Sequence, residues 1–448
     1  MEHHPPMEPE QAPPGDGIHP IRIVVADDLE RSRLTVFFRL LLAIPLYIWF
    51  LIWSFFASLI SIVNWVITLV KGSSPASLHD FFAAYVRFTT HLHAYVLLAA
   101  NPYPGFTGKP GYPIDIEVDP PAPQRRWKTL IRFILALPAL ILATVLVGAP
   151  GGGGGGGGGV NGRDGDDAGT GWGAGFGSTF LVVSVLAWFV CLARARMPRG
   201  MRDLFAYGLR YAAQAGAYLF FLTDRYPNAD PALPPAAPPE KPRAVHLHLT
   251  DDLRRSRLTV FFRFLLFLPH LVWLFLWGIA VFVAAIANWF ATLVTGRSPA
   301  ALHRFLAAYV RYSVQVGAFL FLIANPFPGF AGAPGYPVEV EIDGPEPQHR
   351  ARTAFRLFLA VPAFIIAGAF SSALQLVGVF GWFAGLALGR MPLGLRNLGA
   401  WAIRYEAETH AYFLLLTETY PYSGPWEFAA SAESAEPEPE PEPEAAFA

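Results

Sequence analysis

Apolar runs of about 35 residues recur along the chain, and each is framed by the same polar and proline positions. A run opens at an arginine, a proline follows six residues later, and a tryptophan stands near its end. A second proline, a second arginine and a third proline follow at matched offsets. Four copies with one spacing indicate an internal repeat of four units. The first arginines are Arg39, Arg132, Arg263 and Arg356, and the second are Arg87, Arg210, Arg311 and Arg404.

Unit two carries an insertion that bears on how each run folds. The first arginine and the tryptophan are 26 residues apart in three units but 56 apart in unit two. The extra 30 residues, 148–177, include nine consecutive glycines. A long insertion is tolerated at a loop tip and not inside a membrane-crossing helix. We therefore predict a helical hairpin in each unit, with turns near Ser54, Gly278 and Ser371–Ser372.

Composition and charge place the chain in a membrane. It is 53% apolar and only 15% charged, whereas a soluble protein is nearer a quarter charged. Basic residues precede and follow each run, whereas Arg163 is the single basic residue in the predicted turns. Under the positive-inside rule this predicts eight crossings, with both termini in the cytoplasm and the glycine-rich loop outside. Abundant Ala, Gly and Pro, with more Arg than Lys, suggest a bacterial source and hence the inner membrane.

Two further elements follow from local periodicity. A stripe of apolar residues at 3.6-residue spacing after each run predicts an amphipathic interfacial helix, with Arg87 and His91 opposite the stripe in unit one. Short alternating segments at 21–25, 114–118, 245–249 and 338–342 predict strands, which we expect to pair into a small cytoplasmic sheet. The predicted fold is mainly α and polytopic, with four repeats of strand, transmembrane helical hairpin and amphipathic helix.

The repeats divide the chain into two membrane halves. Residues 19–227 form the first repeat pair, with the glycine-rich loop at 148–177, and residues 244–423 form the second. A Pro-rich linker spans 228–243. Residues 1–18 are predicted to be a disordered leader, and residues 424–448 a disordered acidic tail that ends in Glu-Pro alternation. The single cysteine, Cys191, excludes an intramolecular disulfide framework.

Several short motifs are shared with a known family. Gly72-Ser73-Ser74-Pro75, Tyr85-Val86-Arg87 and Asn101-Pro102-Tyr103-Pro104 resemble the DUF4389 family of bacterial membrane proteins. The resemblance is strong over 19–111 and 246–335, and weaker copies extend to 227 and 421. In the weaker copies Gly208 and Ala402 replace the tyrosine, and Asp224 and Glu418 replace the asparagine. The family implies no activity, so the resemblance supports only the membrane assignment.

The eight repeated arginines are the candidate site residues. One interpretation makes each first arginine an interfacial anchor that reaches to the headgroups. The other pairs it with the second arginine of its unit in a site for a lipid phosphate. Arg210 with Asp224, and Arg404 with Glu418, are candidate ion pairs if the chain folds back after the helix.

No residue pattern predicts a catalytic site, a cofactor or a metal. His91 and His93 would face different ways on a helix, and His246 and His248 have no accompanying cysteine or carboxylate cluster. The glycine run lacks the Lys-Ser/Thr of a phosphate-binding loop.

These observations favour a non-enzymatic membrane scaffold that binds anionic lipid headgroups or partner proteins at the cytoplasmic face. Expected partners are membrane lipids and other membrane or cytoplasmic proteins, and not nucleic acid. The alternative is a transporter or channel along a pseudo-fourfold axis, with Asn64 and Asn288 on a polar path. A membrane enzyme acting on lipid phosphates would need an acid, base or metal cluster that the sequence does not show.

Overall fold

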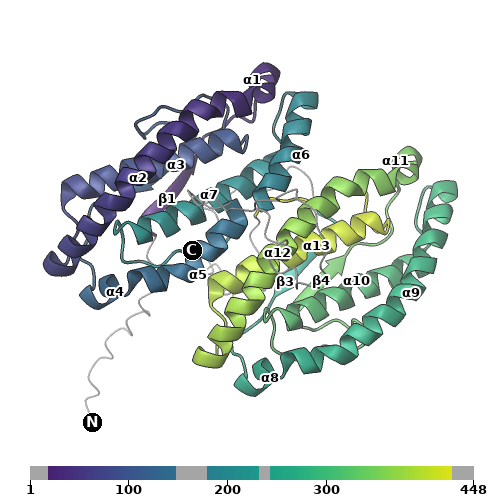
Figure 1. The fold of residues 1–448 in the computed structure, drawn as a ribbon. Coiled ribbons are helices and arrows are strands. Elements are labelled where there is room, and N and C mark those ends of the chain that lie inside the picture. The colour runs from purple at the N-terminus through teal and green to yellow at the C-terminus, as the bar shows by residue number, and fades with distance from the viewer. Residues whose placement is uncertain (1–18, 148–178, 232–242, 426–448) are drawn as a thin grey trace, which may run out of the picture.

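The computed structural model describes residues 19–147, 179–231 and 243–425 (Figure 1). The predicted leader and glycine-rich loop, most of the linker, and the acidic tail from residue 426 on lie outside these residues. Each unit contains a strand, a short helix, a long apolar helix (two shorter apolar helices in unit two) and a 21-residue inner helix. The elements are β1 (Ile21–Val25), α1 (Arg33–Phe37), α2 (Arg39–Lys71) and α3 (Ala76–Val96) in unit one, and β2 (Ile114–Val118), α4 (Arg126–Leu130), α5 (Arg132–Val147), α6 (Thr179–Arg194) and α7 (Arg199–Leu219) in unit two. Unit three has β3 (Val245–Leu249), α8 (Arg257–Phe261), α9 (Arg263–Thr295) and α10 (Ala300–Leu320), and unit four has β4 (Val338–Ile342), α11 (Arg350–Ala354), α12 (Arg356–Leu388) and α13 (Leu393–Phe413).

The long helices are continuous, so the prediction of hairpins is wrong, and with it the prediction of eight crossings. α2, α9 and α12 each run for 33 residues, and the predicted turns at Ser54, Gly278 and Ser371–Ser372 lie inside them. The Ser54 hydroxyl donates to the Phe50 carbonyl one turn back (2.6 Å) and lies 2.8 Å from the Tyr85 hydroxyl of α3. Ser54 therefore serves helix packing and does not mark a turn. All three helices are long and apolar enough to cross a membrane, judged by length and composition.

In unit two the insertion interrupts the equivalent of a long helix. Residues 148–178 separate α5 from α6, and both pieces pack against α7. Phe180 of α6 lies edge-on to Phe205 of α7, with ring centroids 5.0 Å apart. Because each piece has its own packing surface, the interruption leaves both helices in place. The insertion therefore did not mark a turn that the other units share.

The inner helices α3, α7, α10 and α13 form the middle of the molecule. Each packs against the long helix of its own unit on one side and against strands on the other. The prediction that this segment is helical is confirmed, but part of its polar face is covered by a strand. His91 of α3 is buried and lies 2.9 Å from the Asp115 carboxylate of β2. At His91 the polar face of the helix thus packs against a sheet, whereas Asp80 on the same helix is exposed.

The four strands lie at the predicted residues, but they form two sheets instead of one. β1 pairs antiparallel with β2, and β3 pairs antiparallel with β4. In the first sheet Ile21 is opposite Val118, and in the second Val245 is opposite Ile342. Each sheet therefore joins the two units of one half, and the halves are joined by helices.

Reciprocal tryptophan contacts hold the two units of each half together. Trp65, at the end of α2, donates to the Thr129 carbonyl in α4 (3.0 Å), and Trp188 of α6 donates to the Val36 carbonyl in α1 (3.0 Å). The second half repeats both contacts, with Trp289 bonded to Thr353 and Trp382 to Val260. Equivalent residues thus exchange the same contact, as about a local two-fold axis. It follows that α2 runs antiparallel to α5 and α6, and α9 antiparallel to α12.

The units are arranged in an open row. Unit one contacts unit two through α3 and α7, unit two contacts unit four through α5, α6 and α12, and unit four contacts unit three through α13 and α10. Figure 1 shows α2 and α9 at opposite flanks. Over the residues that the structure describes, no substantial contact closes units one and three into a ring. The expected pseudo-fourfold axis is therefore absent from this part of the chain.

Candidate functional site

The four first arginines lie in the interior, although they open the apolar runs. Their exposed fractions are 0 to 2%. Arg39 donates from Nη1 to the carbonyls of Tyr95 (2.7 Å) and Ala100 (3.0 Å), which lie at and just beyond the end of α3. Its guanidinium also lies over the Tyr95 ring, 4.3 Å from the centroid. The equivalent bonds run from Arg132 to Tyr218 and Thr223, from Arg263 to Phe319 and Ala324, and from Arg356 to Thr417.

The physical role of this arginine is to cap an inner helix. The last carbonyls of a helix have no intrahelical partner. Leu98 follows α3 with a left-handed backbone (φ 62°), and Ala100 N–H returns to the Ala94 carbonyl. The remaining carbonyls turn inward, where a buried cation satisfies them and complements the negative end of the helix dipole. The same left-handed residue recurs as Phe221, Leu322 and Leu415.

The second arginines also bind backbone carbonyls. Arg87 donates to Ile116 and Gly108 (both 3.3 Å), and Arg311 donates to Val340 (3.1 Å) and Gly332 (3.4 Å). In the even units the acceptors are the carbonyls of Asp230 for Arg210, and of Tyr422 and Gly424 for Arg404.

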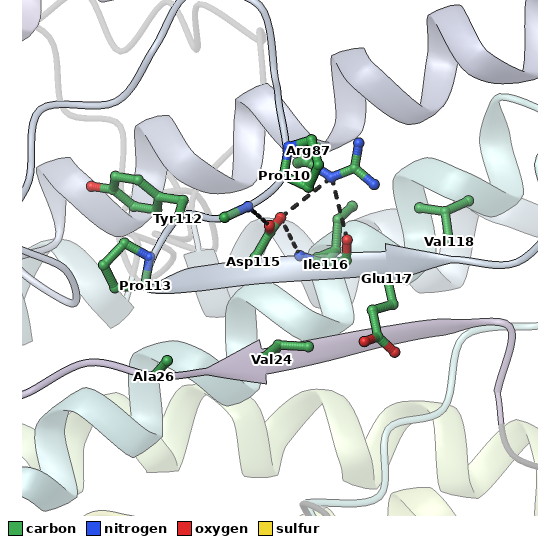
Figure 2. Close-up of a pocket in the computed structure, with 11 residues that line it drawn as sticks. Val24, Ala26, Arg87, Pro110, Tyr112, Pro113, Asp115, Ile116, Glu117 and Val118 are labelled. Atoms are coloured by element: carbon green, nitrogen blue, oxygen red, sulfur yellow. Dashed lines mark hydrogen bonds and ion pairs between the residues drawn. The ribbon is translucent and has the colours of Figure 1, made fainter.

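Figure 2 shows the pocket beside Arg87, where the strand β2 passes α3. The Asp115 carboxylate accepts from Gly111 N (2.7 Å) and Ile116 N (2.7 Å) and lies 3.3 Å from Arg87 Nε. Burial opposes its ionisation, but the hydrogen bond with His91 and the two backbone N–H groups outweigh burial, so the pKa of Asp115 lies below its usual value. A carboxylate with all these partners has a structural role, and it is a poor general base because its pKa is lowered.

The predicted acid partners lie elsewhere. Asp224 pairs with Arg132 (2.8 Å) and not with Arg210. Glu418 pairs with Arg352 (3.2 Å), whereas Arg404 pairs with Glu408 (3.2 Å). The first and second arginines of one unit are therefore not brought together in a shared site. Since all eight guanidiniums are engaged by carbonyls or carboxylates, a headgroup role for them stays a prediction that their geometry does not favour.

Asn64 and Asn288 join units as well. Asn64 is fully buried, donates to the Phe220 carbonyl beyond α7 (3.2 Å) and accepts from Ser74 (2.9 Å). Asn288 donates to the Leu414 carbonyl (3.0 Å) and accepts from Ser298 (2.7 Å). Both amides are thus committed to inter-unit contacts. Within the described ranges, no three His, Cys, Asp or Glu side chains gather where they could hold a metal ion.

The largest exposed feature is the outer surface of the long helices. Along α2 the side chains of Leu40, Phe55 and Val70 are 73%, 62% and 67% exposed, so the apolar surface runs from one end of the helix to the other. One narrow stripe, which includes Phe50 and Asn64, faces the protein. α9 repeats this pattern, with exposed residues such as Phe264, Phe275 and Val294. α12 exposes apolar residues only near its two ends, such as Leu357, Phe383 and Leu388, because its middle is buried.

Exposed basic residues stand at both ends of this surface, in four places that we call the basic corners. Each corner combines the end of one long helix with the short helix of the neighbouring unit. In the first corner Arg33 donates to the Ala193 carbonyl (3.0 Å), and in the third and fourth Arg257 and Arg350 donate to Ala387 (3.2 Å) and Val294 (3.0 Å). The corners are Arg33, Arg194 and Arg196; Lys71, Arg125 and Arg126; Arg254, Arg257 and Arg390; and Arg297 and Arg350, all exposed.

Sequence reasoning passed over this set, although a signal was present. Arg33, Arg126, Arg257 and Arg350 each precede the first arginine of their unit by six residues. In the sequence they are only part of a general basic flank. These arginines lie beside the C-terminal end of a helix from the neighbouring unit only because the helices of paired units are antiparallel. The sequence spacing does not show that arrangement.

The comparisons agree with the repeat. The family described as a domain of unknown function, DUF4389, matches residues 33–107, 175–229, 257–331 and 350–424. These four matches cover more than half of the chain, so the chain belongs to the DUF4389 family, in four tandem copies. No curated protein and no solved structure matches it. Together with the three apolar helices, the family suggests a membrane protein.

Proposed function

We propose that this chain is a non-enzymatic membrane scaffold that binds anionic lipids through the basic corners and lipid chains through the long helices. One observation carries the proposal: continuous exposed apolar surfaces on α2 and α9, and exposed apolar patches at the two ends of α12, all bounded by exposed arginine or lysine. Contiguous apolar surfaces of this extent mark contact with membranes or other proteins. The basic residues at their ends favour a membrane, because each contributes about 1 kcal/mol near an anionic surface.

The corners replace the repeated arginines as the headgroup-binding groups in this proposal. The exposed side chain of Arg33 has five N–H donors and uses one of them in a hydrogen bond to the Ala193 carbonyl. Arg39, six residues later, is 2% exposed and already bound to Tyr95 and Ala100. A phosphate could therefore meet Arg33 without breaking an internal contact, whereas it would have to displace the helix cap to reach Arg39.

Titration of the detergent-solubilised protein with short-chain phosphatidylglycerol tests the proposal, with phosphatidylcholine beside it. We expect the double variant Arg33→Gln/Arg257→Gln to bind phosphatidylglycerol more weakly than the wild type. The matched control is Lys109→Gln/Arg304→Gln, which removes the same charge from exposed positions outside the corners. Equal weakening in both variants would reduce the effect to net charge. Unchanged binding in both would remove the corners from the proposal.

The transporter alternative draws no support from a particular residue. Asn64 and Asn288 are buried hydrogen-bonding partners of neighbouring units, and the units form a row without a common centre.

A further inference from the structure

We propose that the long helices lie in the plane of the membrane, embedded in one leaflet, and do not cross it. The inference rests on the membrane binding proposed above and names the geometry of that contact. The occupant of the apolar face is then a single leaflet, with its anionic headgroups at the basic corners. Three independent features lead to this arrangement: the length of the apolar surface, the charge at its ends and the layers behind it.

The apolar surface is too long for a crossing helix. A helix of 33 residues is about 50 Å long, whereas the hydrocarbon core is about 30 Å thick. The exposed apolar residues of α2 extend over this whole length, from Leu40 to Val70. To keep this stretch of about 45 Å in hydrocarbon, a crossing helix would need a tilt of about 48°, beyond the usual range of 0 to 40°. An in-plane helix has no such limit.

The charges at the ends of the helices lead to the same conclusion. Arg33 precedes α2 by one short helix and Lys71 ends it; Arg257 and Arg297 frame α9 in the same way. Basic residues favour the cytoplasmic side of a membrane. A continuous crossing helix would place one cluster of each pair on the opposite side. In-plane helices keep both clusters on one side, and so satisfy the charge pattern that first suggested hairpins.

The layers behind the long helices are unsuited to a bilayer interior. The inner helices separate the long helices from the sheets. On β1 and β2, Arg22 pairs with Glu117 (3.2 Å) and Asp119 (2.9 Å), with all three side chains at least one-third exposed. Two-stranded sheets also leave backbone groups at their edges, and lipid cannot satisfy those groups. If the long helices crossed the membrane, these sheets alongside them would enter hydrocarbon. In-plane helices leave the sheets in water.

Depth measurement along α2 tests the arrangement. Leu40→Cys, Phe55→Cys and Val70→Cys, each in a Cys191→Ala background, would carry a spin label in vesicles of phosphatidylcholine and phosphatidylglycerol. All three native side chains are exposed, so the labels should not disturb the core. We expect equal, shallow depths, because an in-plane helix sits about 5 to 10 Å into the leaflet. A label at Phe55 much deeper than both others would overturn the inference.

Sidedness gives a second, independent readout. Arg33→Cys and Lys71→Cys should react with a membrane-impermeant maleimide from the same side of sealed vesicles, together with Val24→Cys on β1. Reaction of Arg33→Cys and Lys71→Cys from opposite sides would overturn the in-plane arrangement while leaving membrane binding intact. Protein that fails to associate with vesicles at all would instead overturn the proposed function, so the two failures are distinguishable.

Discussion

Arg132 illustrates how a charged side chain is accommodated at the start of an apolar helix. Its guanidinium is fully buried, donates to the carbonyls of Tyr218 and Thr223, and pairs with Asp224 at 2.8 Å. It also lies over the Tyr218 ring, 4.6 Å from the centroid. The planar fork of arginine matches this set of acceptors, and the single ammonium of lysine cannot reach them all.

We therefore expect Arg132→Lys to lower the free energy of unfolding by about 1–3 kcal/mol, because it leaves buried acceptors without donors. Arg125→Lys makes the same exchange at an exposed position and should change stability by less than about 0.5 kcal/mol. Denaturant unfolding in mixed micelles would measure both. Equal effects of the two substitutions would show that the cap is not selective for arginine.

A second residue-scale prediction concerns Glu406 of α13. Burial raises its pKa to about 7, so the folded protein holds a proton that the unfolded chain, with a pKa near 4.5, releases. This contribution to stability is fully present below pH 4.5 and is lost as the pH rises through 7. The wild type should thus be less stable at pH 8 than at pH 5, and Glu406→Gln should reduce that difference. Thermal unfolding at the two pH values tests this, and an unchanged difference would exclude Glu406 as its source.

At the scale of elements, the sequence predicted what depends on local periodicity. Alternation over Ile21–Val25 and its three equivalents predicted the strands, and 3.6-residue spacing predicted helix at α3. The continuity of α2 could not be predicted from the local sequence, because a serine occurs both at helix ends and at contacts between helices. The contact of Ser54 with Tyr85, which shows that this serine packs against another helix, is visible only in the structure. The partners of Arg39 were equally hidden, since backbone carbonyls carry no side-chain signature.

Excision of residues 148–177 tests the relation between α5 and α6. The deletion restores the 26-residue spacing from Arg132 to Trp188 that the other units have. Because both pieces already pack on α7, we expect a protein that is folded and at least as stable as the wild type, with α5 and α6 fused. Hydrogen exchange across the new junction would show protection like that of the middle of α12. A protein that no longer folds would show that the excised residues are needed by the fold.

At the scale of the whole molecule, the two halves are joined by a buried interface as well as by the linker. Tyr207 of α7 lies edge-on to Trp401 of α13, with centroids 4.9 Å apart, and Tyr422 donates to Asp203 (2.9 Å). Asn397 donates to Asp230 (2.8 Å) beside them. This interface lies between the even units, which occupy the middle of the row.

The halves should therefore stay together when the linker is cut. Co-expressed fragments 1–236 and 237–448, with one tag between them, are expected to co-purify. Trp401→Ala, which removes a side chain only 1% exposed, should release the untagged fragment. Trp127→Ala is the control, because that tryptophan is 59% exposed on α4. Fragments that separate without any substitution would show that the linker supplies the association.

The reciprocal tryptophan bonds also bear on how such a protein can arise. Trp65 needs the Thr129 carbonyl of another unit, and Trp188 needs the Val36 carbonyl in return. A polypeptide with one unit would leave its indole and its acceptor unmatched unless two copies met about a two-fold axis. Half of this chain is then equivalent to a homodimer whose subunits have been fused end to end, and the four units together are equivalent to a fusion of two such dimers.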